Sequence, residues 1–524
     1  MDVLLNRPMP HTTIPCDVAS PLLDATVRDA RTVLARRADG AGTAATATAT
    51  EPARRVVTRA EALGLAHFVR DVTRSPYLGV VIDHTATAVA TQRVGHPPHS
   101  TDADALTLSW ETQLGSAVYV NVDTNVRDPD LLRQVILHAT VTKTPPMTWG
   151  PLADDGDRSD PPKPATYLPV ALWHQRTIAA MASERGEALA QLTAPFAGTA
   201  WHGMGTAACA ARAFFFLSPG GDVDAWGEST DSEVSVTARA ADGSAVGWSG
   251  RAHRDWGQLQ LTEVAKTAIA EAERHRNPSR FEPGRYTAIL SATAVGQLLQ
   301  AMAGRYNIMQ DSPFNLPRGS MANGGRSDRR GQRVFDPRIT LSSDPADLDG
   351  GDLPFFYGDG GMGNPNPTST WVEHGVLKLR SAAVNDALMA GLTPRKDPLA
   401  VRMSGGPTSV AEMIASCERG IYVHRFANLE VVDPRSGALS GFTRDGCLLI
   451  MHGKIARPIK DFRIFESPFL SFNRVLALGT PERVAFGFIP PNTNNPYFQW
   501  PLPPVIAPPM MVTDFNFAAL SDAV

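Results

Sequence analysis

Apolar residues that recur every three or four positions predict several helices in the first half of the chain. Thr58 and Glu61 form a capping box, the usual sign of a helix start, ahead of "RAEALGLAHFVRDVTRS". A second helix is predicted over "DPDLLRQVILHAT", where Pro129 occupies a first-turn position. Two more are predicted over "ALWHQRTIAAMASERGEALAQL" (171–192) and "LTEVAKTAIAEAERHR" (261–276).

Between these helices, β-branched and alternating segments predict strands. They are "YLGVVIDHTATAVATQRV" (77–94), "AARAFFFL" (210–217) and "SEVSVTARAADGSAVGWSGRA" (232–252). Asp242-Gly243 lies between two alternating runs in the last segment, which indicates a β-hairpin.

From residue 283 onward the pattern changes to short strands, hairpins and turns rich in glycine and proline. Two segments, "STWVEHGVLKLRSAA" and "CLLIMHGKIARPI", each predict two strands that join at a His-Gly pair, His374-Gly375 and His452-Gly453. The segment "LEVVDPRSGALSGF" turns through residues 433–437.

Two helices are predicted in this second half. The segment "SVAEMIASCERG" has a capping box, Ser409 and Glu412, and Gly420 is placed to end the helix. Earlier, a strand from Tyr286 to Leu290 leads into an apolar helix with the sequence "LLQAMAGR". Residues 488–510 are rich in proline and asparagine and are expected to wrap a surface rather than form an element.

These patterns together predict an α+β protein of more than one domain, because 524 residues exceed what one compact core holds. Residues 1–57 are predicted to be an N-terminal extension, partly flexible because 40–53 is of low complexity. Residues 58–282 are expected to form a mixed α/β domain. Residues 283–524 are expected to form a domain of mainly antiparallel strands and hairpins with a few helices and a Pro-rich tail.

Charge and composition narrow the function classes. A net charge of −4 gives no electrostatic footprint for nucleic acid or an anionic membrane. The chain has neither a signal-peptide pattern at its start nor an apolar run long enough to cross a membrane. Its four scattered cysteines form no CxxC pair. We therefore expect a cytoplasmic protein with free thiols.

The usual metal and nucleotide motifs are missing from the sequence: it has no HExxH, HExxxH, paired CxxC or DxDxDG. The glycine-rich segment 357–367, which contains Asp359, precedes a strand rather than a helix and is interpreted as a loop. His424 lies on a predicted strand and is interpreted as a hydrogen-bonded histidine on a half-buried face. Cys417, placed in the helix 409–419, and Cys447, placed in a strand, are interpreted as small buried hydrophobic residues.

The second half of the chain resembles the TldD/PmbA family (PmbA is also called TldE). The resemblance rests on "DLPFFYGDGGMGNPNPTSTWVEHGVLKL", "RMSGGPTSVAEMIASCERGIYVHRF" and "VVDPRSGALSGFTRDGCLLIMHGKIARPIKDFRI". It covers roughly 284–480 well and 58–283 more weakly. The resemblance implies one of two subunit types: a TldD-type zinc metallopeptidase with an HExxxH helix, or a PmbA-type partner without it.

When the family motif is placed on this chain, its His-Glu-x-x-x-His positions fall on Gln300, Ala301 and Arg305. Glutamine is a poor zinc ligand, alanine offers none, and arginine stays cationic. The C-terminal cysteine ligand expected in TldD-type chains is also missing, since residues 448–524 contain no cysteine. The resemblance therefore implies a chain that holds no metal and no cofactor, with zinc in a TldD-type partner.

The preferred hypothesis is a PmbA/TldE-like pseudoenzyme in a heterodimer or larger assembly with a TldD-like metallopeptidase. It would help form the chamber in which unfolded or modified peptides are cleaved, peptide maturation included, with Asp359 and His424 as candidate substrate or partner contacts. Whether the chain is itself an enzyme stays open. One alternative is a peptidase with a rebuilt site, for which Arg305, Asp359, His424 and Cys447 are the candidates. Another is a diverged member that acts in a specialised-metabolite or peptide-natural-product tailoring pathway.

Overall fold

The structure is a computed structural model of the 524-residue chain. It describes residues 56–74, 79–111, 119–124, 129–143, 171–218, 224–302, 330–352, 354–355, 366–379, 400–433, 436–487 and 503–521. Residues 1–55 of the predicted extension and residues 357–365 of the glycine-rich loop lie outside these described residues.

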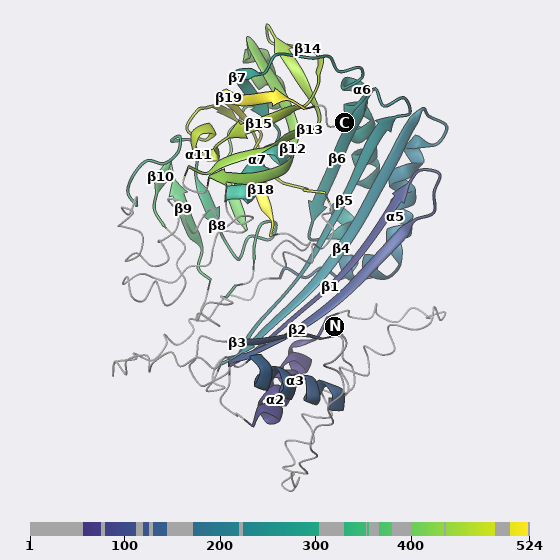
Figure 1. The fold of residues 1–524 in the computed structure, drawn as a ribbon, viewed down its shortest axis with the longest axis vertical. Coiled ribbons are helices and arrows are strands. Elements are labelled where there is room, and N and C mark those ends of the chain that lie inside the picture. Colours follow the sequence, from purple (N-terminus) through teal and green to yellow (C-terminus); the bar gives the residue numbers. More distant parts are fainter. Residues whose placement is uncertain are drawn as a thin grey trace, which may run out of the picture.

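A long, twisted antiparallel sheet dominates the first half of the chain (Figure 1). Its strands follow the order β3-β2-β1-β4-β5-β6. Their bounds are β1 Val80–Arg93, β2 His99–Glu111, β3 Tyr119–Thr124, β4 Trp201–Leu217, β5 Asp224–Ala240 and β6 Val246–His253. The Asp242-Gly243 turn joins β5 to β6 as predicted, with Gly243 at φ 75°.

Helices cover one side of this sheet, and the C-terminal half of the chain lies on the other (Figure 1). The helices are α2 Arg59–Thr73, α3 Pro129–Lys143, α4 Gln175–Ala179, α5 Arg185–Thr193 and α6 Leu261–Arg274. The capping box of Thr58 and Glu61 is present at the start of α2. Every second side chain of β4, Phe215 among them, joins the core under the helices, because alternate residues of a strand face opposite sides.

The helix predicted over 171–192 begins later and is not uniform. It starts at Gln175, and a π-helical turn, Ala180–Glu184, separates α4 from α5. Sequence periodicity alone does not show such a turn, because the wider π turn keeps the same apolar side facing the sheet over a few residues.

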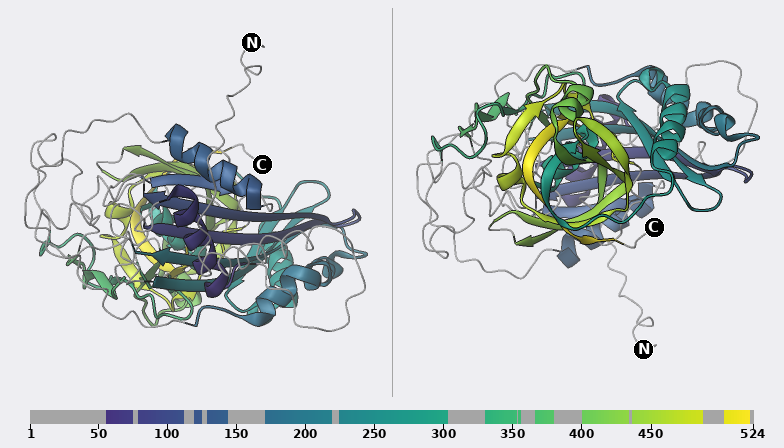
Figure 2. Two further views of the ribbon diagram at one scale, coloured as in Figure 1. Left: turned by 90° about the horizontal axis from the view of Figure 1, so that it is seen from below. Right: turned by 90° about the horizontal axis from the view of Figure 1, so that it is seen from above.

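The second half of the chain contains a closed barrel, which is visible end-on in Figure 2. Strands β12, β7, β19, β15 and β13 follow one another, and β13 pairs again with β12 to close the ring. Only β7 and β12 run parallel among these neighbours. The bounds are β7 Gly284–Leu290, β12 Arg419–Asp433, β13 Ala438–Met451, β15 Phe462–Glu466 and β19 Met510–Leu520, with β14 Lys454–Ile459 and β16 Val475–Leu478 added outside the ring.

A smaller sheet adjoins the barrel, in the order β10-β9-β8-β11-β18-β17. Its strands are β8 Leu341–Ser343, β9 Ser369–Glu373, β10 Val376–Leu377, β11 Val401–Met403, β17 Glu482–Arg483 and β18 Val505–Ala507. Helix α7, Ala292–Gln300, contacts both β12 of the barrel and β18 of this sheet. Two short helices, α10 Val410–Ser416 and α11 Pro468–Ser471, complete the described elements.

The α+β prediction is confirmed. Both His-Gly hairpins are present, with His374, Gly375, His452 and Gly453 all at positive φ. Successive left-handed residues are what a tight two-residue turn between antiparallel strands requires.

Two sequence predictions in the second half are wrong. The helix with the Ser409 and Glu412 capping box ends at Ser416, so Cys417 is its extended C-cap rather than an interior residue. Gly420 lies in β12, where an added Cβ would stand 2.6 Å from Cys417 Sγ. Part of the Pro-rich tail forms an element after all, since β18 is buried and pairs in parallel with β11.

Candidate functional site: the helix after β7

Helix α7 starts where β7 ends, and its first turn is fastened to the barrel. The Ser291 hydroxyl accepts a hydrogen bond from the Ala294 N–H at 3.1 Å and donates one to the carbonyl oxygen of His424 on β12. The N-cap therefore satisfies an otherwise unpaired helix N–H and ties the helix to β12 in the same step.

The middle of α7 is held even more closely. Gln297 Nε2 donates to the Phe426 carbonyl at 2.9 Å, and the Phe426 N–H donates to Gln297 Oε1 at 2.7 Å. On the neighbouring face, a Cβ added at Gly296 would stand 2.7 Å from Val484 Cγ2, so only glycine lets the helix approach this closely. Val295, Leu298 and Leu299 are buried in the core between the barrel and the smaller sheet.

The positions on which the resemblance places the family's metal motif follow this packed segment. Gln300 is the last residue of α7 and is half-buried, and Ala301 is its C-cap with 1% of its surface exposed. Arg305 lies outside the described residues. Within the part of the chain that the structure describes, no three or more His, Cys, Asp or Glu side chains gather in a way that suits a metal ion.

His424 lies on β12, and its carbonyl oxygen is the one that accepts the hydrogen bond from Ser291. Its ring stands edge-on to Trp248 of β6, with centroids 5.9 Å apart. His424 is half-buried, with both ring nitrogens shielded from solvent and the main chain of Trp248 beside the ring. Burial lowers the pKa of His424 to about 4, and nearby Asp445 opposes this only in part. The ring is therefore neutral at physiological pH.

Cys447 is the other candidate for a rebuilt catalytic site that the structure describes. It lies on β13, is 0% exposed, and its Sγ is 3.9 Å from Asp461 Oδ1. Burial, with the negative charge of Asp461 adding to it, raises the pKa of this thiol well above its usual value. A neutral, buried thiol is a poor nucleophile. Asp359 lies outside the described residues.

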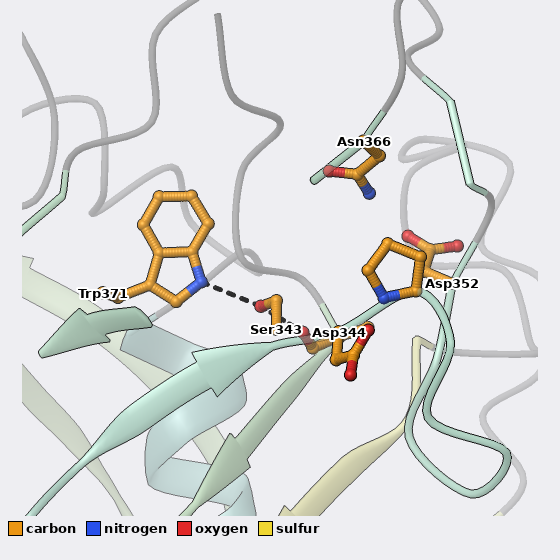
Figure 3. A pocket seen from close by; sticks show the side chains of 7 residues that line it. Ser343, Asp344, Asp352, Asn366 and Trp371 are labelled. Atoms are coloured by element: carbon orange, nitrogen blue, oxygen red, sulfur yellow. Dashed lines mark hydrogen bonds between the residues drawn. The ribbon is translucent and has the colours of Figure 1, made fainter. Parts of the chain in front are cut away.

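A small hollow lies at the edge of the smaller sheet (Figure 3). The indole N–H of Trp371 donates to Ser343 Oγ at 2.9 Å, and Asp344, Asp352 and Asn366 line the rest. Its volume of about 10 Å³ has room for about one water molecule. The hollow is therefore too small to hold a peptide.

Sequence reasoning missed a charged cluster between the two halves of the chain. It consists of Asp231 and Glu233 on β5, Arg254 just after β6, and Arg483 on β17. The only sequence signal is the alternation in "DSEVSV", which places both carboxyl groups on one face of a strand.

Comparisons with known proteins agree with the fold. The sequence model of the family described as "PmbA/TldA metallopeptidase C-terminal domain" matches residues 283–519. No curated protein matches the sequence. The structure of TldE from Thermococcus kodakarensis is similar over 86% of this chain and 99% of its own, with a TM-score of 0.64 and 14% identity.

Two further structures are similar to the same extent, both of proteins described as candidate modulators of DNA gyrase. The one from Thermotoga maritima has a TM-score of 0.63 and 16% identity over 86% of this chain and 99% of its own. The one from Bacteroides thetaiotaomicron has a TM-score of 0.61 and 17% identity over 86% and 98%. At these identities the three structures establish a shared fold.

The described features thus define an α+β protein of the TldD/TldE type with a metallopeptidase-related C-terminal domain. Residues 283–519 belong to the TldD/PmbA family.

Proposed function

We propose that this chain is the non-metal, PmbA/TldE-like subunit of a peptidase assembly in which a TldD-type partner holds the zinc. The single observation that carries the proposal is the state of α7. The helix is packed and hydrogen-bonded into the core, while Ala301 offers no ligand atom and Gln300 offers only an amide. A helix kept by its packing and lacking its ligands fits a subunit that contributes structure rather than a metal.

An open strand edge offers a place for an extended peptide. Strand β3 pairs only with residues 106–111 of β2, so the earlier part of β2 has no strand on its outer side among the described residues. Side chains from His99 to Ala105 are exposed there, and Thr101, Ala103 and Ala105 are small. A peptide that adds at this edge would be recognised through its main chain, with little demand on its sequence.

The proposed partner is a TldD-like chain in a heterodimer or larger complex, with the two subunits together enclosing the peptide. Nucleic acid and membrane are not part of the proposal. No helix in the described ranges is long and apolar enough to cross a membrane. The cytoplasmic location suggested by the cysteine content stays a prediction.

The rebuilt-peptidase alternative gains no support from its two described candidates. Burial favours the neutral forms of both: Cys447 is 0% exposed, and the ring nitrogens of His424 are shielded from solvent. No described residue supports the tailoring-pathway alternative.

Co-expression with a TldD-type chain from the same genome tests the proposal. We expect the two chains to co-elute in size exclusion, and zinc-dependent cleavage of unfolded peptide to require both. Zinc should be found with the partner alone. Peptides N-methylated at alternate residues should compete less well than unmodified ones, because strand addition uses main-chain N–H groups. Stoichiometric zinc together with hydrolysis by this chain alone would refute the proposal, as would partner activity that this chain leaves unchanged.

A further inference from the structure

The N-terminal sheet and the C-terminal half meet along a short segment, residues 483–487, which we call the seam segment. It begins with Arg483 on β17 and runs past β5 and β6. Ala485 packs against Trp248 and Ala252 of β6 in a small apolar cluster. A second apolar contact between the halves lies at Phe355, against Phe214 of β4. The contact of the seam segment with β5 is polar.

The polar part is the charged cluster on β5. Arg483 Nη2 lies 2.5 Å from Asp231 Oδ2, and Arg254 Nη1 lies 4.0 Å from the same oxygen. Each guanidinium also donates to the main chain of residues 349–351, which lie between β8 and β9. Arg483 Nη1 donates to the Asp349 carbonyl at 2.8 Å, and Arg254 donates to the Gly351 carbonyl. The two arginines thus join β5 to residues 349–351 of the C-terminal half.

The cluster is buried but incompletely paired. Arg254 and Glu233 are 4% and 6% exposed, and the side chain of Arg483 is 9% exposed. Among the described residues, Glu233 Oε1 and the Nε atoms of both arginines have no hydrogen-bond partner. A buried polar atom without a hydrogen bond disfavours the closed arrangement, because water would solvate that atom on opening. These unpaired buried atoms therefore oppose closure of the seam and favour its opening.

Glu233 is the titratable side chain that links β5 directly to the main chain of the seam segment. Its Oε2 accepts the N–H of Phe486 in the seam segment at 3.4 Å, a long hydrogen bond. Burial raises the pKa of Glu233 to about 7, against the backbone N–H groups of Phe486 and Gly487, which lower it. The carboxyl is thus divided between its neutral and charged forms near neutral pH, and a buried carboxylate is much costlier than the acid.

We propose that the seam is a proton-controlled latch: the protonated carboxyl of Glu233 lets residues 483–487 close on β5, and loss of that proton to solvent favours their separation. The inference concerns this chain alone and does not depend on the proposed partner or on peptide cleavage.

The direction of the effect follows from linkage. The closed seam binds the proton at a pKa of about 7, whereas a solvated glutamate has a model value of 4.5. Closure is therefore favoured fully below about pH 4.5, and this contribution is lost as the pH rises through 7. Between pH 6 and pH 8 the opening equilibrium constant should rise on the order of tenfold.

Other charged and titratable groups face the same seam and set its background. On the cluster side they are Asp231, His253, Arg254, Asp347, Asp349, Asp352, Glu482 and Arg483, and on the barrel side His275, His424, Arg425 and Asp445. Burial lowers the pKa values of His253, His275 and His424, so their protonation on acidification opposes closure below their ordinary range. A comparison of two proteins that differ only at Glu233 removes this background.

Hydrogen exchange of the full chain measures the latch directly. Amide exchange of residues 483–487 is followed from pH 6 to pH 8 and corrected for the intrinsic pH dependence of exchange. In the unmodified chain we expect the opening constant to rise about tenfold over this range. In Glu233→Gln, which keeps the shape and cannot ionise, we expect that rise to disappear.

Glu187→Gln serves as the matched control, because Glu187 is an exposed carboxylate on α5 away from the seam. It should keep the tenfold rise. The proposal is overturned if the unmodified chain shows no rise, whatever the variant does, or if Glu233→Gln keeps the rise.

Discussion

The side-chain amide of Gln297 on α7 makes both main-chain hydrogen bonds of Phe426 on β12, at 2.9 Å and 2.7 Å. The glutamine side chain thus makes the two hydrogen bonds that a neighbouring strand would make, beyond the end of β7. Strand β7 pairs with β12 only from Gly420 to Val423, so on that side Phe426 lies beyond the end of β7, where α7 takes its place.

Gln297→Ala should lower the free energy of unfolding by about 2 kcal/mol, because it leaves a part-buried N–H and carbonyl of Phe426 unpaired. Gln300→Ala, in the last turn of the same helix, should change it by less than about 0.5 kcal/mol. Urea unfolding of the three proteins measures both effects. Equal losses in the two variants would show that the Phe426 contact carries no special weight.

Gly446→Ala should cost about 3 kcal/mol or more, since it combines a strained backbone with a clash. Gly446 has φ 101°, and an added Cβ would stand 2.2 Å from Cδ2 of His275, which caps α6. Gly243→Ala is the matched control: φ is 75° but nothing lies within 4 Å, so about 1 kcal/mol is expected. Thermal unfolding distinguishes strain alone from strain with a clash, and similar losses would contradict the contact with α6.

Asp461 should make stability fall as the pH rises. Burial raises its pKa to about 6 from 3.8, so the folded state holds the proton more tightly than the unfolded state does. That contribution is present below about pH 3.8 and is lost as the pH passes 6. Between pH 4 and pH 8, the free energy of unfolding of Asp461→Asn should therefore rise relative to that of the unmodified chain. The expected rise is roughly 2–3 kcal/mol, measured by urea unfolding. A constant difference across this range would rule out ionisation of Asp461 as the cause.

The three described cysteines should resist thiol reagents in the native protein. Cys209 and Cys447 are 0% exposed and Cys417 is 2% exposed. In a Cys16→Ser variant, a colorimetric thiol assay should find almost no reactive thiol until the protein is unfolded. Rapid native labelling of Cys447 would reopen the rebuilt-peptidase alternative.

Removal of metal should leave this chain unchanged. Because α7 is held by Ser291 and Gln297 rather than by ligands, a chelator should not shift its unfolding temperature. Added zinc should not raise it either, since a ligand stabilises only the state that it binds. A zinc-dependent rise with one ion per chain, measured by elemental analysis, would contradict the non-metal interpretation.

Local features were predictable because their causes are local. The capping boxes at Thr58 and Ser409 and the His-Gly hairpins are each defined by residues within four positions of one another. Helix ends were less secure. Gly420 resembled a helix stop, but it is required in β12 by the close approach of Cys417 and Thr287, and Thr287 lies far away in sequence.

In the candidate site, too, some properties follow from the sequence and others from the fold. The sequence by itself determined that the metal-motif positions carry Gln300 and Ala301, because side-chain chemistry does not depend on the fold. It also determined the α+β pattern, since the change from helical to alternating periodicity is written along the chain.

Only the tertiary structure decided what those residues are for. Closure of the barrel through β12 and β13 buries Cys447 and shields the ring nitrogens of His424, which favours the neutral form of each side chain. The ion pair between Arg483 and Asp231 joins residues 252 positions apart. A pKa depends on burial and on neighbours brought together by folding, and that is why no reading of the chain in order could have found the latch at Glu233.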